Sequence, residues 1–91
     1  MTEATVIILD KKLDIADLAG DKVMVDFDTG KYYLLKGAAN DIWDHIQTDI
    51  TLGALVDKLL EAYDIDRAGC LASTTTFLQD LADNGFILLK D

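Results

Sequence analysis

The chain has 91 residues, enough for one small domain with a single modest core. Hydrophobic residues make up 51% of the sequence and proline is absent, a composition typical of folded rather than disordered proteins. The net charge of −9 argues against nucleic-acid and anionic-membrane partners, because binders of either kind depend on clustered lysine and arginine.

The sequence also bears on compartment and domain number. No apolar run is long enough to span a membrane, and the N-terminus, Met1-Thr2-Glu3, lacks the basic region of a signal peptide. Cys70 is the one cysteine, so an internal disulfide cannot form and a reducing compartment suits the chain. We therefore expect a single domain over residues 1–91, located in the cytoplasm and without a membrane partner.

The N-terminal part of the chain predicts strands. Apolar residues predict a first strand somewhere in residues 5–18. Alternating apolar and polar side chains over residues 22–27, and aromatic residues over 31–36, predict two more strands. Asp28-Thr29-Gly30 lies between them, and Gly30 can take the positive φ that short hairpin turns need.

Helical patterns follow the hairpin. A helix is predicted over residues 38–47, with Trp43 packed in the core. A second helix begins after Thr51, a good N-cap, and a third runs from an Asp66 cap to a stop at Asn84-Gly85. Residues 86–89 form either a short strand or a plug against the core. This order predicts a winged-helix-like α+β domain, with a three-stranded antiparallel N-terminal sheet followed by three α-helices.

The third helix carries two apolar stripes, rotated by about 100° from each other. The first comprises Cys70, Thr74, Phe77 and Leu81, and the second comprises Leu71, Thr75, Leu78 and Ala82. We expect the first to face the core and the second to be free for another contact. A broad core face, with threonine hydroxyls bonded back to the helix, is the alternative.

The sequence offers little for catalysis. His45 is the one histidine, and Cys70 lies on the predicted core stripe, whereas a reactive thiolate needs a polar, electropositive setting. A metal site needs several Cys or His ligands at short spacing, and these are missing from the sequence. We therefore expect no enzymatic activity, no metal and no cofactor.

An ordered set of segments resembles the PqqD family, also called RiPP recognition elements (RiPPs are ribosomally made, post-translationally modified peptides). The resemblance covers about residues 13 to 88. Its anchors are Val25-Asp26-Phe27-Asp28-Thr29-Gly30-Lys31-Tyr32-Tyr33-Leu34-Leu35, Ala38-Ala39, Ile42-Trp43, Leu55-Val56, Leu59, Tyr63-Asp64-Ile65-Asp66, Phe77-Leu78, Leu81 and Gly85-Phe86-Ile87. It implies a protein that binds the leader region of a precursor peptide and presents it to modifying enzymes.

The resemblance also implies where the leader binds, because family members hold it between the third strand and the third helix. An edge strand over residues 31–35 can accept the leader as an added strand, with side-chain pockets supplying sequence preference. Tyr33 and Leu35 are assigned to the core, and Tyr32 and Leu34 to the outer rim. The predicted peptide-binding residues are Lys31, Tyr32, Tyr33, Leu34, Leu35, Leu71, Thr74, Thr75 and Leu78. Family members often carry an acidic residue where this chain has Ser73, so a leader contact through that acid is not expected here.

Several other interpretations stay open at this point. Residues 28–33 look most like the stand-alone members of lasso-peptide pathways, whose partners are a leader peptidase and a cyclase. The other family context is pyrroloquinoline quinone biosynthesis, with a radical-SAM enzyme as partner. Outside the family, a winged-helix DNA-binding protein would use the third helix for recognition, but Arg67 is the one cation there. A structural subunit that binds a folded partner through the same strand edge is a further alternative.

Overall fold

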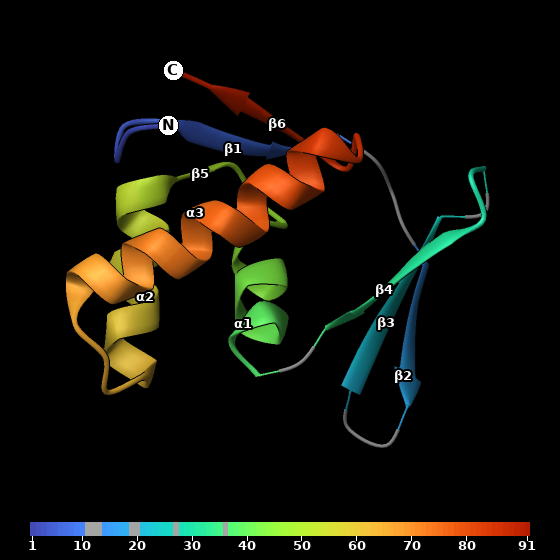
Figure 1. The fold of residues 1–91 in the computed structure, drawn as a ribbon, viewed down its shortest axis with the longest axis horizontal. Helices are drawn as coiled ribbons and strands as arrows, with labels where there is room; N and C mark the ends of the chain where they lie inside the picture. The colour runs from blue at the N-terminus through green and yellow to red at the C-terminus, as the bar shows by residue number, and fades with distance from the viewer. Residues whose placement is uncertain (11–13, 19–20, 27, 36) are drawn as a thin grey trace.

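The described part of the chain contains six strands and three helices. The computed structural model describes residues 1–10, 14–18, 21–26, 28–35 and 37–91. Figure 1 shows the three helices packed together, with one small sheet above them and a second sheet at the right. In chain order the elements are β1 (Val6–Leu9), β2 (Asp14–Leu18), β3 (Asp21–Asp26), β4 (Lys31–Leu35), α1 (Ala38–His45), β5 (Ile50–Thr51), α2 (Leu52–Ala62), α3 (Arg67–Asp83) and β6 (Ile87–Lys90).

The expected hairpin forms the centre and one edge of an antiparallel sheet of order β2-β3-β4. Met24 pairs with Tyr33, and Val23 with Leu34. Gly30 has a φ of 72°, and its N–H donates to the carbonyl of Asp26 at 2.8 Å, which closes the turn as the sequence predicted. The ends of the predicted strands at residues 27 and 36 lie outside the described residues.

The predicted first strand is in fact two strands that belong to different sheets. β2 joins the hairpin, whereas β1 lies in a second antiparallel sheet of order β5-β1-β6. β1 pairs with β6 at the other end of the chain, for example Val6 with Lys90 and Leu9 with Ile87. No local pattern reports such a distant partner. Both alternatives for residues 86–89 hold in part: Ile87–Lys90 is strand β6, and the buried side chains of Phe86 and Ile87 plug the core.

The N-terminal residues are fixed to the start of α2. The N–H groups of Leu52 and Gly53 donate to the carbonyls of Thr5 and Glu3, each at 2.9 Å. These bonds satisfy two of the N–H groups that the first turn of a helix leaves unpaired. A Cβ on Gly53 would lie 3.2 Å from atoms of Glu3, so the glycine permits this close approach.

The helix boundaries largely follow the predicted caps. The Thr51 hydroxyl oxygen accepts from the N–H of Ala54 at 3.2 Å, and the Asp66 carboxylate accepts from Gly69 at 3.3 Å. α3 is capped by Asn84, and Gly85 follows it with a φ of 79°. α1 ends two residues before the predicted position 47.

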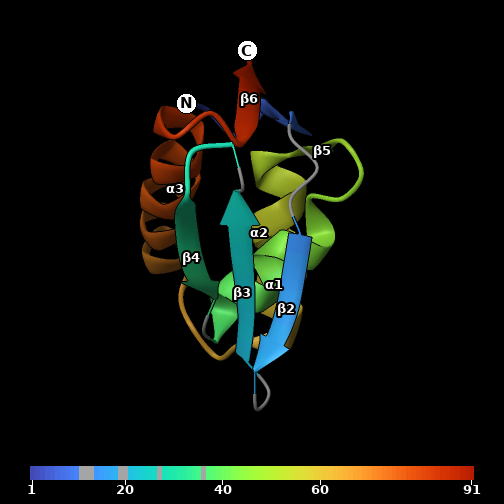
Figure 2. The ribbon, with the colours of Figure 1, turned by 90° about the vertical axis from the view of Figure 1, so that its right-hand side faces the viewer.

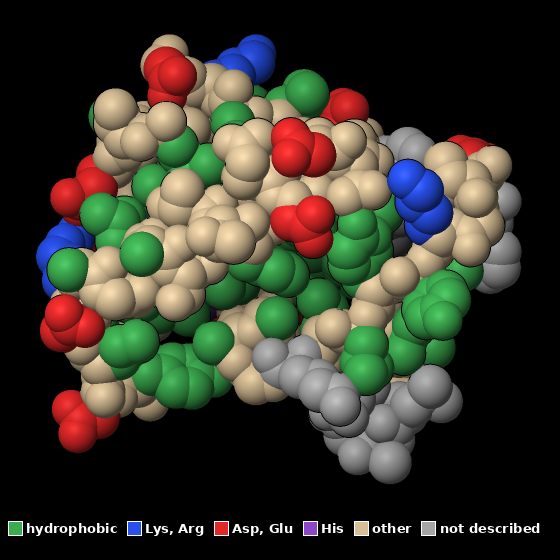
Figure 3. All heavy atoms as spheres, viewed as in Figure 1, with side chains coloured by type: hydrophobic (Ala, Val, Ile, Leu, Met, Phe, Trp, Pro, Cys, Tyr) green, Lys and Arg blue, Asp and Glu red, His purple; other side chains and the backbone are tan. Residues whose placement is uncertain are grey.

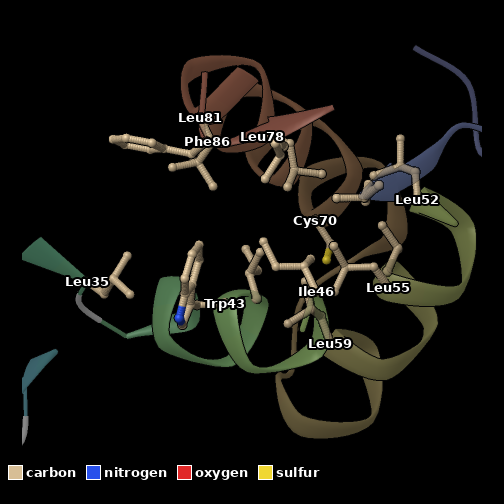
Figure 4. Packing of buried hydrophobic residues seen from close by; sticks show 14 of the residues in the cluster. Leu35, Trp43, Ile46, Leu52, Leu55, Leu59, Cys70, Leu78, Leu81 and Phe86 are labelled. Carbon is tan, nitrogen blue, oxygen red and sulfur yellow. The ribbon is translucent and has the colours of Figure 1, made fainter. Parts of the chain in front are cut away.

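The core lies where the three helices and the inner faces of both sheets meet. Figure 4 shows side chains from α1, α2 and α3 pointing toward one another, with Leu35 and Phe86 at one end of the cluster. Trp43 is buried among them, as expected, and Met24 is the fully buried side chain of β3. The α+β class and the order of the helices agree with the prediction. The winged-helix likeness is loose, because the second sheet covers one end of the helices.

No helix in the described ranges combines the length and apolar character that crossing a bilayer requires.

Phe86 tests how strongly the C-terminal segment holds the fold. Its ring packs on Tyr33 in an edge-to-face contact with centroids 5.2 Å apart. Phe86→Ala should lower the free energy of unfolding by about 3–5 kcal/mol, through lost apolar contact and the cavity left behind. Leu88→Ala is the matched control, because Leu88 on β6 is exposed, and it should change stability by about 0.5 kcal/mol. Urea unfolding followed by circular dichroism compares the two, and equal losses would contradict this role of Phe86.

Candidate functional site

The edge strand of the hairpin sheet borders α3. Among the described strands, β4 pairs with β3 alone, so one side of its backbone has no strand partner. Figure 2 shows β4 as the edge nearest α3, with β2 at the opposite edge of the same sheet. An edge of this kind presents N–H and C=O groups that another strand can pair with.

The side chains of β4 divide between the two faces as the alternation predicted. Leu35 is fully buried and Tyr33 is half-buried. Burial raises the pKa of the Tyr33 phenol, and the nearby Asp80 carboxylate raises it further. On the other face, 74% of Tyr32 and 48% of Leu34 are exposed. Exposed apolar side chains on the outer face, and a half-buried tyrosine on the inner face, flank an open backbone edge and suit a peptide that carries alternating apolar residues.

The assignment of the faces of α3 was wrong at two positions. Leu78, which was expected on a free face, is completely buried, and Phe77, which was expected in the core, is only half-buried. The two side chains point in directions about 100° apart on a helix, so the true core row is rotated from the predicted one. That row comprises Cys70, Thr74, Leu78 and Leu81. The rotation arises because α3 packs against α2, β6 and the core together, and the sequence of α3 does not reveal these partners.

The remaining predicted residues of α3 are divided. Leu71 and Thr75 are half-buried, whereas Thr74 is buried with its hydroxyl oxygen 3.9 Å from the sulfur of Cys70. Thr76 donates its hydroxyl to the carbonyl of Ala72 at 3.0 Å, which is the back-bonding that the alternative reading of this helix expected. The free surface of α3 is therefore narrower than a full second stripe.

A polar contact joins β4 to the end of α3. The Lys31 ammonium donates to the side-chain oxygen of Asn84 at 3.3 Å, beside a shallow hollow of about 430 Å³ that Tyr32 and Tyr33 also line. Below α3, Figure 3 shows hydrophobic side chains gathered in a recess between the helix and the hairpin sheet. Phe77 and Asn84 were not among the predicted site residues. The family anchors include Phe77, but the sequence analysis placed it in the core, whereas the structure leaves it half-buried.

The charges of α3 do not suit nucleic acid. Arg67 donates to the carboxylates of Asp57 (2.6 Å) and Glu3, and these two bonds raise the pKa of its guanidinium. A cation held by two carboxylates is poorly placed to contact a phosphate. This pairing argues further against the DNA-binding alternative.

The candidate catalytic residues have structural settings. Cys70 is a buried free thiol in the core, and His45 is partly buried in the last turn of α1. Within the described residues, no three His, Cys, Asp or Glu side chains are grouped so that they could hold a metal ion. The chemistry that this arrangement favours is binding through a strand edge and apolar side chains.

Comparisons with known proteins agree with this geometry. The family described as "Coenzyme PQQ synthesis protein D (PqqD)" matches residues 21–87, which is most of the chain. A solved structure described as "TbiB1 in Complex with the TbiA(beta) Leader Peptide" superposes with a TM-score of 0.77 at 21% identity, covering 88% of this chain and 93% of that one. At this identity the likeness shows a shared fold. No curated protein matches the sequence.

The corrected phase of α3 predicts which substitutions unfold the domain. Leu78→Glu should unfold it as Leu81→Glu does, because each would bury a carboxylate without a partner. Thr75→Glu, three residues before Leu78 and half-buried, is the matched control and should keep the native circular dichroism spectrum. A folded Leu78→Glu variant would restore the original assignment of a free face.

Proposed function

Because this chain belongs to the PqqD family, we propose that it binds the leader region of a ribosomally made precursor peptide and delivers it to modifying enzymes. The observation that carries the proposal is the open edge of β4 beside α3, flanked by apolar side chains on both faces. The leader adds to β4 as a further strand, so that backbone hydrogen bonds set its register. The shared fold with a protein solved in complex with a leader peptide supports this mode.

Side chains give the added strand its sequence preference. Residues i and i+2 of the leader point to the same face, so one set enters the space between Tyr33 and α3. The other set lies beside Tyr32 and Leu34 on the outer face. Leu71 and Thr75, which are half-buried, remain proposed peptide contacts on the helix. Thr74 and Leu78 are both buried, so we propose that they support these contacts from the core and do not touch the peptide.

The proposed activity is delivery rather than catalysis. A leader held by this domain places the rest of the precursor at a local concentration of up to about millimolar for an enzyme bound nearby. We favour the lasso-peptide context, in which a leader peptidase and a cyclase are the partners. The family description names coenzyme PQQ synthesis. In that alternative context the family resemblance implies a radical-SAM enzyme as the partner. Identifying the genes that neighbour this one, above all that of the precursor peptide, would distinguish the two contexts. The free cysteine fits work in the reducing cytoplasm.

N-methylation of the leader tests strand addition directly. Leader peptides of the cognate precursor, each methylated at one backbone nitrogen, are titrated into the protein by calorimetry. In a strand, alternate N–H groups face the neighbouring strand, so methylation should weaken binding at every second position. Each loss should be about tenfold, since a hydrogen bond is lost and the methyl group holds the strands apart. The intervening positions are internal controls. Uniform losses, or none across the segment, would contradict binding by strand addition.

A second experiment tests whether any residue of this chain takes part in the processing reaction itself. His45→Ala and Cys70→Ala should leave the rate of precursor processing by the partner enzyme unchanged once both variants are shown to fold and to bind leader. Cys70 is enclosed in the core, and the proposed peptide surface does not include His45. A variant that binds leader normally but abolishes processing would show that the chain takes part in the reaction.

A further inference from the structure

The edge of the hairpin sheet opposite β4 is also open. Among the described strands, β2 pairs with β3 alone. Figure 2 shows β2 on the side of the sheet away from α3. The free backbone edge of β2 can therefore hydrogen-bond to a further strand, as the edge of β4 can. The two edges carry different side chains, and these determine which strand each edge can accept.

Ile15 of β2 occupies a core-facing position without a full cover. It lies opposite Met24 of β3, so the two side chains share the face of the sheet that packs on the helices. Met24 is 1% exposed, whereas Ile15 is 40% exposed. The sheet therefore extends beyond the core at β2, and the inward side of this strand leaves apolar surface in water. A strand added to β2 would place a side chain beside Ile15 and bury part of that surface.

Ala16 of β2 faces the opposite side of the sheet. The register aligns it with Val23 of β3 and Leu34 of β4, so the three side chains form one row across the strands. Ala16 and Leu34 are exposed, and Val23 is half-buried. Because this row is apolar from one edge of the sheet to the other, an added strand continues it best with an apolar residue next to Ala16.

The inward face beside Ile15 is acidic. Asp17 is exposed there and lies opposite Lys22 in the register with β3. The Lys22 ammonium donates to the carboxylate of Asp44 on α1 at 2.9 Å. This bond raises the pKa of the ammonium, and the nearby carboxylates of Asp17 and Asp41 raise it further. Three carboxylates around one ammonium leave an excess of negative charge, which attracts a cationic side chain.

A second copy of this chain does not suit the β2 edge. Pairing of β2 with itself would bring two acidic strands together, and like charges on neighbouring strands are destabilising. The net charge of −9 on each copy adds to the repulsion. Charged side chains protect a strand edge from self-pairing. The same charges leave the edge available to a basic segment.

We infer that the β2 edge binds an extended segment of a second protein as an added strand, with a basic side chain beside Asp17 and apolar side chains beside Ile15 and Ala16. Charge complementarity and the incompletely covered Ile15 specify this occupant. The inference goes beyond the proposed function, because leader binding uses β4 and leaves β2 free. A sheet that carries the leader on one edge and this segment on the other holds the precursor and the second protein on one rigid unit.

A short peptide of matching chemistry tests the inference. The probe is acetyl-Lys-Val-Ile-Val-Lys-amide, whose pattern is the same in both directions and so fits parallel or antiparallel addition. Titrated to millimolar concentration into ¹⁵N-labelled protein, it should shift the amides of residues 15–17 more than those of residues 31–35. The matched control peptide, acetyl-Glu-Val-Ile-Val-Glu-amide, should leave the amides of residues 15–17 unmoved, because its carboxylates are repelled.

Charge reversal on the protein is the second test. Asp17→Lys should weaken binding of the lysine probe at least about fivefold, since an attraction is lost and a repulsion replaces it. Glu61→Lys is the matched control, because Glu61 is an exposed carboxylate on α2, and it should leave binding within about twofold of wild type. Circular dichroism first confirms that both variants fold. If Asp17→Lys does not, Asp17→Asn and Glu61→Gln supply the same comparison.

Several results would overturn the inference. They are amide shifts at residues 31–35 alone or at neither edge, equal binding of the lysine and glutamate peptides, and equal weakening by Asp17→Lys and Glu61→Lys. Shifts at residues 15–17 that grow with protein concentration in the absence of probe would also overturn it, because they would identify a second copy as the occupant. None of these measurements uses the leader, so their outcome is independent of the N-methylation experiment.

Discussion

The structure depends on how the hairpin sheet is attached to the helices. Its inner face contributes Met24, Leu35 and the half-buried Tyr33 to the core, and Tyr33 contacts Phe86 edge-to-face. These apolar contacts hold β4 near α3 while its backbone edge stays without a partner strand in the described structure. Two polar contacts accompany them: Lys22 with Asp44 at 2.9 Å and Lys31 with Asn84 at 3.3 Å. Exposed pairs of this kind contribute little to stability, so apolar burial sets the position of the edge.

This division of roles lets a small domain keep an aggregation-prone feature. An open strand edge with exposed tyrosine and leucine invites pairing with any extended chain. The edge is only five residues long, and a net charge of −9 makes the molecules repel one another. The same charge tolerates a leader with basic residues and disfavours an acidic one. In the proposed binding mode, sequence preference therefore has to come from the side chains on either side of the edge.

Local signals in the sequence were enough for much of the fold. The turn at Gly30, the caps at Thr51 and Asp66, and the stop at Gly85 each depend on residues next to one another, and all were predicted correctly. The alternation in β4 put Tyr33 and Leu35 on one face, and the family resemblance identified that face as the inward one. The pairing of β1 with β6 was not predicted, because its partners stand at opposite ends of the chain. Phe77 and Leu78 were each assigned to the wrong face of α3 for the same reason. The elements packed around α3 determine which of its faces is buried, and the sequence of α3 alone does not reveal those elements.

The elements that form the candidate site could be predicted to the same extent. The edge strand follows from the hairpin and from its direct connection to α1, so residues 31–35 could be identified from the sequence. The apolar pocket between the three helices could not be predicted, because Ile42, Leu59 and Cys70 come together only after the helices pack. Tyr63 and Ile65, near the junction of α2 and α3, were local signals of an apolar surface there, but neither indicates a pocket unless the packing of the helices is known.

The central claim is that a leader peptide pairs with β4, and amide chemical shifts test it most directly. On titration with the cognate leader, the amides of residues 31–35 should shift most. The amides of β2, at the other edge of the same sheet, should stay nearly unchanged and so serve as the internal reference. Shifts confined to β2 or to the helices, with the β4 amides unmoved at saturation, would contradict the account.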